Sequence, residues 1–302
     1  MRYQLWLALC VLLTALMPAR GEPAGKVTVA AYNVENFFDV FDDPYTEDEE
    51  MQPKSRDAIE RLAQTIRDIN PDVLGLVEIE STGAVEAMVA EFLPDAGYRH
   101  IAVMPTNSGR GIHLGVVSRL PVLSMTSHRF RELTLPDVPG RTWTFARDLL
   151  EVVVEPAPGR KMHLFIVHLK SRHDGPDDPM SANWRMAEHT MVRRIVAERL
   201  AADPAAWVAV MGDFNDTPDT PGVRAYLEGQ GDQSPLLYDV HAAPDPERPL
   251  TYLRGQYRSV IDYILVSPSL YERLDAVGIP TNEAELLKAS DHAPVWARFR
   301  VE

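Results

Sequence analysis

The stretch Pro71-Asp72-Val73-Leu74-Gly75-Leu76-Val77-Glu78 decides the fold class of this chain. Its apolar run over residues 73–77 has no polar alternation, which is typical of a strand covered on both faces. Directly before it, residues 56–69 have helical periodicity, and Asn70-Pro71 ends that helix. A fully buried strand after an amphipathic helix indicates a sheet with helices on its outer side.

The same alternation continues outward in both directions. Further strands are predicted at 27–32, 115–118, 150–154, 163–168, 207–211, 261–266 and 295–300, and further helices at 82–92 and 181–201. The turn Pro156-Ala157-Pro158-Gly159 predicts a hairpin of two neighbouring strands. Lone strands, hairpins and helices together indicate an α/β or α+β sandwich with mixed sheets. No repeat or linker divides residues 25–302, so one catalytic domain is expected.

Residues 1–21 have the pattern of a secretory signal peptide. Arg2 precedes an almost unbroken apolar segment from Leu5 to Met17, and Pro18 to Gly21 interrupt it. The segment is short for a membrane span, although an uncleaved anchor is the alternative. We therefore expect a secreted or periplasmic protein with no stable membrane span after cleavage. The single cysteine, Cys10, lies in this segment, which excludes thiol chemistry in the mature chain.

The charge balance excludes one class of function. The net charge is −14, from 30 basic and 44 acidic residues, whereas proteins that coat polyanions without sequence preference are usually basic. An enzyme that bridges its carboxylates to a phosphate through a cation is still compatible with this balance.

Several polar clusters follow apolar strand-like runs. Because open sheets place their sites beyond strand ends, these clusters are expected to converge. They are Asn33 with Glu35, Glu78 with Glu80, His168, Asp213 with Asn215, and Asp291 with His292.

Asp213 and Asn215 stand at i and i+2 of an extended stretch, so their side chains point the same way. A carboxylate beside an amide could align a water molecule and hold a phosphate oxygen. The alternative is a turn in which both side chains only satisfy local backbone groups.

The remaining clusters combine carboxylates with imidazoles. An Asp262 side chain that accepts a hydrogen bond from His292 would fix the tautomer of this imidazole and raise its pKa. Glu78 ends a buried strand, so its charge needs a partner such as a hard cation, or else a helix cap or salt bridge. His168 is either a donor to phosphate or a neutral structural histidine.

Together these segments resemble the endonuclease/exonuclease/phosphatase superfamily, whose fold is that of deoxyribonuclease I. The matching motifs occur in family order at residues 32–36, 71–78, His168, 212–215, 261–264 and 290–292. The resemblance implies a four-layer α/β sandwich, with two packed mixed β-sheets flanked by helices. Residues 36–39, Asn-Phe-Phe-Asp, look like a variant of a motif of exported bacterial members.

The resemblance also implies a divalent cation and a set of ligands. Mg²⁺ or Mn²⁺ is expected, with Ca²⁺ as a further candidate, held mainly by Glu78. Asn33, Glu35 and Asp291 are expected in or near the coordination sphere. The sequence is compatible with one bound metal ion or with two. Val77 replaces the glutamine that many members carry before this glutamate, so altered tuning of the site is expected.

The same resemblance assigns roles in hydrolysis. Asp213 would orient and deprotonate the attacking water, although His292 is an alternative base. Asn215 would position the phosphate. His168 and His292, the latter held by Asp262, would donate to the non-bridging oxygens as negative charge develops.

Five cations are expected to bind substrate. Arg110 and Arg147 resemble recurrent family positions, and Lys170 and Arg172 follow His168 in the sequence. Arg185 lies one helical turn from Glu188, so pairing between these two is the alternative for Arg185.

The leading hypothesis is an exported, monomeric nuclease that acts on DNA or RNA. A hydrolase of small phosphoesters, such as inositol phosphates or lipid head groups, is the alternative, and a non-catalytic binding protein is the third possibility. No basic, aromatic-rich insertion is evident, which disfavours abasic-site repair. The acidic residues 39–50 are expected to form a surface loop, with a calcium site or a lid as alternatives.

Overall fold

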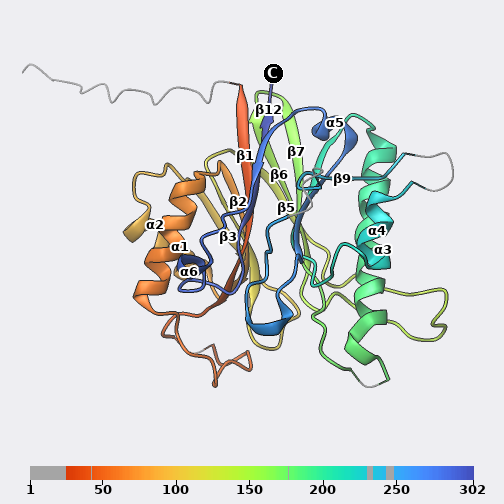
Figure 1. The fold of residues 1–302 in the computed structure, drawn as a ribbon, viewed down its shortest axis with the longest axis horizontal. Coiled ribbons are helices and arrows are strands. Elements are labelled where there is room, and N and C mark those ends of the chain that lie inside the picture. Colours follow the sequence, from red (N-terminus) through yellow and green to blue (C-terminus); the bar gives the residue numbers. More distant parts are fainter. Residues whose placement is uncertain (1–24, 42, 176, 230–233, 243–247) are drawn as a thin grey trace, which may run out of the picture.

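A computed structural model describes residues 25–41, 43–175, 177–229, 234–242 and 248–302. The predicted signal peptide at residues 1–21 lies outside these described residues. The described chain forms four layers, with two sheets in the middle and helices on both outer faces (Figure 1). The predicted sandwich of two packed mixed β-sheets is therefore confirmed.

Each sheet contains six strands. The first has the order β11 (Leu274–Gly278), β12 (Val295–Arg300), β1 (Lys26–Phe37), β2 (Val73–Ile79), β4 (His113–Ser118), β3 (His100–Met104). The second has the order β5 (Val122–Ser127), β6 (Leu149–Ala157), β7 (Arg160–His168), β8 (Trp207–Asp213), β10 (Asp262–Val266), β9 (Tyr238–Asp239).

The helices divide between the two outer faces. Helices α1 (Arg56–Ile69), α2 (Thr82–Phe92) and α6 (Glu283–Leu286) cover the first sheet, whereas α3 (Ala182–Ala202) and α4 (Pro221–Leu227) cover the second (Figure 1). Three further turns are helical: η1 (Pro179–Ser181), η2 (Gly255–Tyr257) and α5 (Pro268–Tyr271). Among the described residues, no helix is long and apolar enough to cross a membrane.

The strands of the two sheets have the same pattern of parallel and antiparallel neighbours. In each sheet a central parallel pair, β1 with β2 and β7 with β8, is linked by a helix, and an antiparallel strand flanks it. The carboxyl ends of the parallel strands and the amino ends of β10 and β12 therefore meet at one edge of the sandwich.

Three apolar clusters hold the layers together. The central one lies between the sheets and includes fully buried side chains such as Val29, Leu164 and Met211. The outer ones pack α1 and α2 on the first sheet and α3 and α4 on the second. Each buried leucine-sized side chain stabilises the fold by about 1.5–3 kcal/mol relative to exposure. This packing keeps the edge that carries the polar clusters rigid.

The helix and strand predictions succeed where the apolar pattern is strong. The helices at 56–69 and 82–92 have the predicted bounds, and Ser55 caps the first by accepting from the backbone N–H of Ala58. The hairpin of β6 and β7 is confirmed. Strands β3, β5, β9 and β11 were missed because they are short or half exposed. The described residues between 38 and 55 contain no helix or strand, as expected of a loop.

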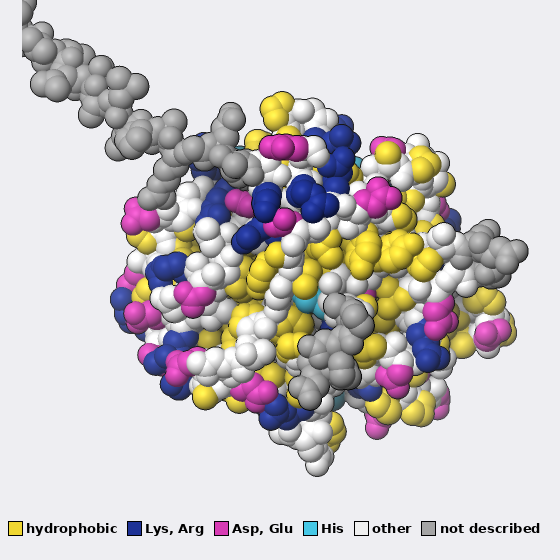
Figure 2. Space-filling view, turned by 45° about the horizontal axis from the view of Figure 1, so that its top comes forward, with side chains coloured by type: hydrophobic (Ala, Val, Ile, Leu, Met, Phe, Trp, Pro, Cys, Tyr) yellow, Lys and Arg dark blue, Asp and Glu magenta, His cyan; other side chains and the backbone are white. Residues whose placement is uncertain are grey.

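Figure 2 turns the end opposite the polar edge toward the viewer. Several basic side chains gather near the upper middle of this view, with acidic side chains among them, and apolar side chains lie below.

Candidate functional site

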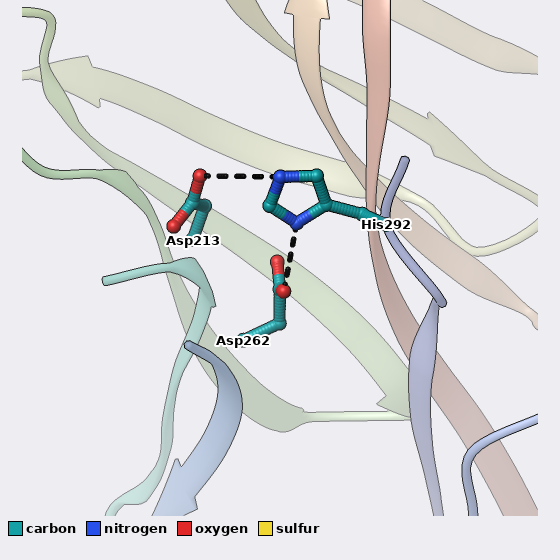
Figure 3. Close-up of side chains that lie close together, drawn as sticks. All are labelled: Asp213, Asp262 and His292. Carbon is teal, nitrogen blue, oxygen red and sulfur yellow. Dashed lines mark hydrogen bonds and ion pairs between the residues drawn. The ribbon is translucent and has the colours of Figure 1, made fainter. Parts of the chain in front are cut away.

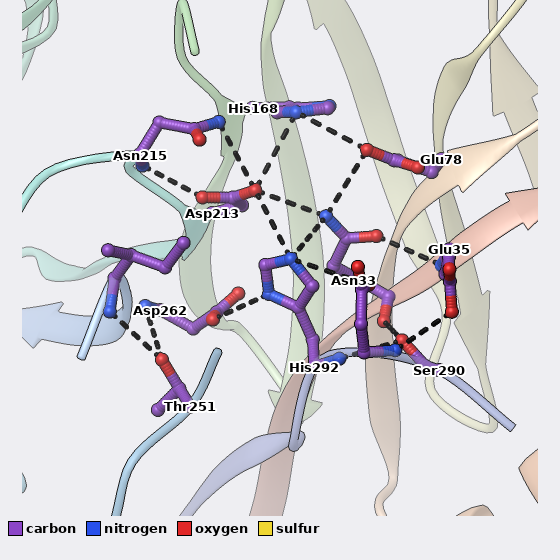
Figure 4. A network of polar contacts seen from close by, with 12 residues as sticks. Asn33, Glu35, Glu78, His168, Asp213, Asn215, Thr251, Asp262, Ser290 and His292 are labelled. Carbon is purple, nitrogen blue, oxygen red and sulfur yellow. Dashed lines mark hydrogen bonds and ion pairs between the residues drawn. The ribbon is translucent and has the colours of Figure 1, made fainter. Parts of the chain in front are cut away.

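The predicted polar residues converge at the edge where the strand ends meet. Asn33 and Glu78 lie near the ends of β1 and β2, and His168 and Asp213 end β7 and β8. Asp262 begins β10 directly opposite Asp213 in the ladder, and Asp291 and His292 precede β12. These residues form one network of polar contacts (Figure 4).

The backbone is irregular where these side chains project. Glu35, Asn36, Glu78 and Asn215 all have positive φ angles, of 48°, 49°, 66° and 51°. Such conformations are uncommon for residues other than glycine and cluster at functional sites. The pairing register of β1 with β2 shifts between Asn33 and Phe37. Strands β1 and β2 are longer than predicted. Their irregular ends turn the carboxylates of Glu35 and Glu78 toward the shared edge.

Asp213 is at the centre of the network and is 2% exposed. Its carboxylate accepts from Asn33 Nδ2 at 3.1 Å and from the backbone N–H and Nδ2 of Asn215 at 2.8 and 3.2 Å. Burial raises the pKa of Asp213, and the neighbouring Asp262 charge raises it further. A carboxylate with a raised pKa is a stronger base than one in water.

His292 lies between two aspartates (Figure 3). Its Nδ1 is 2.8 Å from Asp262 Oδ2, and its Nε2 is 3.9 Å from Asp213 Oδ2. Burial alone would lower the pKa of His292, but the charge and hydrogen bond of Asp262, together with Asp213, raise it to about 10. The imidazole is therefore protonated at neutral pH, with Nδ1–H donating to Asp262 as predicted. Thr251 fixes Asp262 by accepting from its backbone N–H at 2.9 Å.

His168 differs from His292 in its protonation. Its Nε2 lies 3.6 Å from Asp213 and 3.7 Å from Glu78. Burial lowers the pKa of His168 well below its ordinary value, and the nearby Arg147 charge lowers it further. The ring is neutral at physiological pH and so can donate one N–H.

Two groups of side chains could hold a divalent cation. The ligand atoms of Asp213, Asp262 and His292 lie within 4.8 Å of one another, the one such group found among the described residues. However, the short His292–Asp262 contact is a hydrogen bond, which leaves this imidazole with one nitrogen for any other partner. We therefore interpret this group as a hydrogen-bonded relay rather than as a set of metal ligands.

The predicted ligands fit a hard cation better. Glu35, Glu78 and Asp291 supply carboxylate oxygens, and Asn33 supplies an amide oxygen, which is the donor chemistry that Mg²⁺ and Mn²⁺ prefer. Glu35 accepts from the backbone N–H of Asp291 at 2.9 Å. Burial, and then the negative charges of Glu35 and Glu78, raise the pKa of Asp291, although His292 and Arg254 oppose this shift. Such a concentration of negative charge favours a bound cation.

Arg254 was missed by the sequence analysis. Its guanidinium lies 2.6 Å from Glu35 Oε1 and 3.4 Å from Asp291 Oδ2, while its side chain is 61% exposed. It therefore neutralises two of the predicted ligands in this structure. No strand or recurrent motif precedes it, so the sequence carries no signal that would have placed it here.

A cavity of about 970 Å³ opens above the network. Three of the five predicted substrate-binding cations line it: Arg110, Arg147 and Arg172. Lys170 and Arg185 do not. The Lys170 ammonium lies over the ring of Trp184, 5.5 Å from its centroid, and Arg185 is only 5% exposed. Substrate contact is therefore not supported for these two residues.

Asp216 explains the position of Arg185 and Arg172. Its Oδ1 is 2.8 Å from Arg172 Nη2 and 3.3 Å from Arg185 Nε, and its Oδ2 is 3.3 Å from His189 Nε2. The alternative pairing of Arg185 with Glu188 is wrong, because Glu188 instead accepts from the backbone N–H groups of Ala146 and Lys170. Glu188 therefore has a structural role, joining α3 to two backbone segments beside the site. Asp216 ties α3 to the cavity wall that carries Arg172.

The sequence model of the endonuclease/exonuclease/phosphatase family matches residues 28–277, a range that includes most of this network. The chain belongs to this family. Family membership supports hydrolysis of phosphodiester bonds and agrees with the superfamily that the motifs predicted.

Comparison with curated proteins gives a short match. Forty residues are 52% identical to exodeoxyribonuclease III of Haemophilus influenzae, covering 13% of this chain and 15% of that protein. The match therefore spans a small part of this relative's length.

Solved structures of the family share the fold over nearly the whole chain. The human Nocturnin catalytic domain, with a bound sulfate, has a TM-score of 0.63 at 15% identity and covers 91% of this chain and 94% of its own. An endonuclease/exonuclease/phosphatase from Bacteroides vulgatus has a TM-score of 0.61 at 19% identity, with 92% and 99% covered. Truncated Caenorhabditis elegans TDP2 has a TM-score of 0.59 at 17% identity, with 91% and 98% covered. At these identities the likeness shows the fold alone.

Proposed function

We propose that this protein is an exported, divalent-metal-dependent phosphodiesterase whose substrate is nucleic acid. The observation that carries the proposal is the arrangement around Asp213. This buried carboxylate with a raised pKa lies between one neutral and one protonated imidazole, below a cavity lined by arginines. These are the groups that hydrolysis of an anionic diester requires.

Asp213 is the proposed base. Asn33 and Asn215 donate to its carboxylate and hold it in one orientation, so that a water molecule above it can be deprotonated. His292, kept protonated by Asp262, and neutral His168 donate to the non-bridging oxygens, where negative charge builds up in the transition state. The alternative base, His292, is disfavoured because its imidazole already carries a proton at neutral pH.

Glu78, with Asn33, Glu35 and Asp291, would hold the divalent cation. When bound, the ion offsets negative charge on the phosphate and leaving group. Arg254 would give up its ion pairs with Glu35 and Asp291 when the cation binds, since its side chain is 61% exposed and can turn toward solvent.

The arginines of the cavity favour nucleic acid over an uncharged substrate. Arg110, Arg147 and Arg172 line the wall together with Arg254 and Arg258, so several phosphates can be bound at once. The apolar segment before Pro18 supports export to a secreted or periplasmic location, with cleavage near Ala19, and a monomer is proposed.

The first test is hydrolysis by the mature chain of plasmid DNA, RNA, bis-p-nitrophenyl phosphate and p-nitrophenyl phosphate, with Mg²⁺, Mn²⁺ or Ca²⁺. Asp213→Asn and His292→Gln remove the proposed base and donor without changing the size of the side chain greatly. His100→Gln, on edge strand β3 outside the cavity, is the matched control.

Metal-dependent cleavage of diesters by the wild type and the His100→Gln variant, lost in the other two, is expected. Cleavage that persists in Asp213→Asn, or that needs no metal, would overturn the proposal. Preference for the monoester over every diester would favour the small-phosphoester alternative.

A further inference from the structure

The cavity extends well beyond the residues needed for hydrolysis. Its floor consists of the carboxylates and imidazoles described above, and its walls carry arginines. Its volume, about 970 Å³, is at the upper end of the range of small-molecule pockets, about 300–1,000 Å³. A single phosphate group would leave most of this space empty, so the rim must contact another part of the substrate.

The rim carries exposed apolar side chains. Nine large hydrophobic residues are exposed in the described chain, and two of them, Met180 and Tyr257, line this cavity. Tyr257 is 71% exposed and ends the short helical turn η2. A phenol ring left in water costs free energy that burial would recover. A planar partner in the cavity would recover part of it.

The turn that presents Tyr257 is fixed to the site. Tyr252 pairs through its backbone with Ser259 and with His292, and the Leu253 N–H donates to Asp291 O at 2.8 Å. The Tyr252 ring also lies against the imidazole of His292, with 5.1 Å between centroids. The position of Tyr257 relative to the reacting phosphate is therefore set by the residues that surround His292 and Asp291.

Cations alternate with aromatic residues along this turn. Residues 252–258 read Tyr-Leu-Arg-Gly-Gln-Tyr-Arg, and Tyr252, Arg254, Gln256, Tyr257 and Arg258 all line the cavity. Arg258 is held by an ion pair with Glu283. Aromatic rings beside arginines form the usual site for unpaired bases, because bases stack on the rings while their phosphates pair with the guanidinium groups.

We propose that the Tyr257 turn binds an unpaired base of a single-stranded nucleic acid and places the adjoining phosphate over Asp213. This inference rests on the proposed function and names its substrate class. A base within a duplex has both faces stacked and cannot meet the ring. An inositol phosphate has no flat apolar face to offer it. The net charge of −14 disfavours binding of a long polyanion over the whole surface, whereas arginines line the cavity.

The test separates base from backbone. Two single-stranded octamers, one of thymidine and one with abasic tetrahydrofuran sugars, carry the same phosphates, and a duplex octamer has its bases already paired. Binding is measured by fluorescence anisotropy in the Asp213→Asn background, which prevents cleavage, with and without Tyr257→Ala. Tyr45→Ala, at an exposed tyrosine outside the cavity, is the matched control.

We expect the thymidine strand to bind on the order of tenfold more tightly than the abasic strand and the duplex. Tyr257→Ala should abolish this preference, Tyr257→Phe should keep it, and Tyr45→Ala should leave it unchanged. A uridine octamer shows whether RNA is accepted equally.

Equal affinity for thymidine and abasic strands in the parent protein would overturn the inference. An equal loss of both affinities in Tyr257→Ala would also overturn it, because it would indicate a structural role. Hydrolysis of bis-p-nitrophenyl phosphate by the wild type tests the proposed function separately. Failure of the base-binding inference is therefore distinguishable from failure of the proposed phosphodiesterase activity.

Discussion

At the scale of single residues, the charge of His292 depends on Asp262. Their 2.8 Å contact is buried, and Thr251 fixes the aspartate from the other side. If Asp262 were neutral, only the more distant Asp213 and Asp291 carboxylates would oppose the effect of burial, so the pKa of His292 would fall.

Asp262→Asn should therefore lower kcat for diester hydrolysis by about 10²-fold, because the pKa of His292 falls and its ring is no longer oriented by the Asp262 carboxylate. KM should change less, since the arginines that bind phosphate are untouched. Steady-state kinetics with bis-p-nitrophenyl phosphate measure both, and Asp275→Asn, an exposed aspartate paired with Lys26, is the control. A variant with wild-type kcat would show that this charge has no part in the reaction.

The motifs predicted the charged and hydrogen-bonding residues that lie at strand ends. Asn33, Glu78, His168, Asp213, Asp262 and His292 were all named, and all meet. Arg254 and Asp216 were not, because an arginine in a turn and an aspartate in a loop resemble ordinary surface residues. Their positions depend on which distant side chains the fold brings near them.

At the scale of elements, Gly212 determines the backbone path of β8 directly before Asp213. Its φ is 128°, and a Cβ atom there would collide with the carbonyl oxygen of Val167 on the neighbouring strand. Only glycine tolerates both conditions.

Gly212→Ala should destabilise the protein by about 2–4 kcal/mol, through backbone strain together with the clash. Gly140→Ala is matched, because Gly140 also has a positive φ, 78°, but has nothing within 4 Å of its Cβ position. It should cost about 1 kcal/mol, from strain alone. Urea denaturation gives both values, and equal losses would contradict the steric explanation.

The Asp216 cluster joins α3 to the cavity wall and makes stability depend on pH. Burial would raise the pKa of Asp216, but His189, Arg185 and Arg172 lower it to about 2 from 3.8. Because the folded pKa is below the unfolded one, this contribution is fully present above about pH 4 and is lost as the pH falls toward 2.

Asp216→Asn should therefore cost about 2 kcal/mol at pH 6 and almost nothing near pH 2. Chemical denaturation of both proteins across this range measures the difference. Glu198→Gln, an exposed pair member on the same helix, should show no such pH-dependent gap. If the difference in unfolding free energy between the wild type and Asp216→Asn stayed constant with pH, the lowered pKa of Asp216 could not be its cause.

At the scale of the whole molecule, two sheets each contribute half of the site. Glu78 and Asn33 come from the first sheet, and Asp213 and His168 from the second. A cation bound by the first half therefore stabilises the folded protein, because its ligands come together only when the strands are paired.

Saturating Mg²⁺ should raise the melting temperature of the wild type by several degrees, since a ligand at about 100 times its Kd contributes about 2.7 kcal/mol. Chelation with EDTA should reverse the shift. Glu78→Gln should remove the response, and Glu80→Gln, whose carboxylate accepts from the backbone N–H of Asp39, should retain it. Differential scanning fluorimetry provides the measurement. A full response in Glu78→Gln would place the cation elsewhere.

The sequence by itself determined the layers of this protein and the chemical identity of the groups at its edge. Apolar periodicity needs only local information, so it predicted the buried strands and the main helices. The motifs indicated the family. The tertiary structure alone decided which groups face one another. It turned Lys170 and Arg185 away from the cavity, brought Arg254 between two carboxylates and left Tyr257 exposed on the rim. These outcomes depend on contacts between residues far apart in the chain, and local patterns do not encode such contacts.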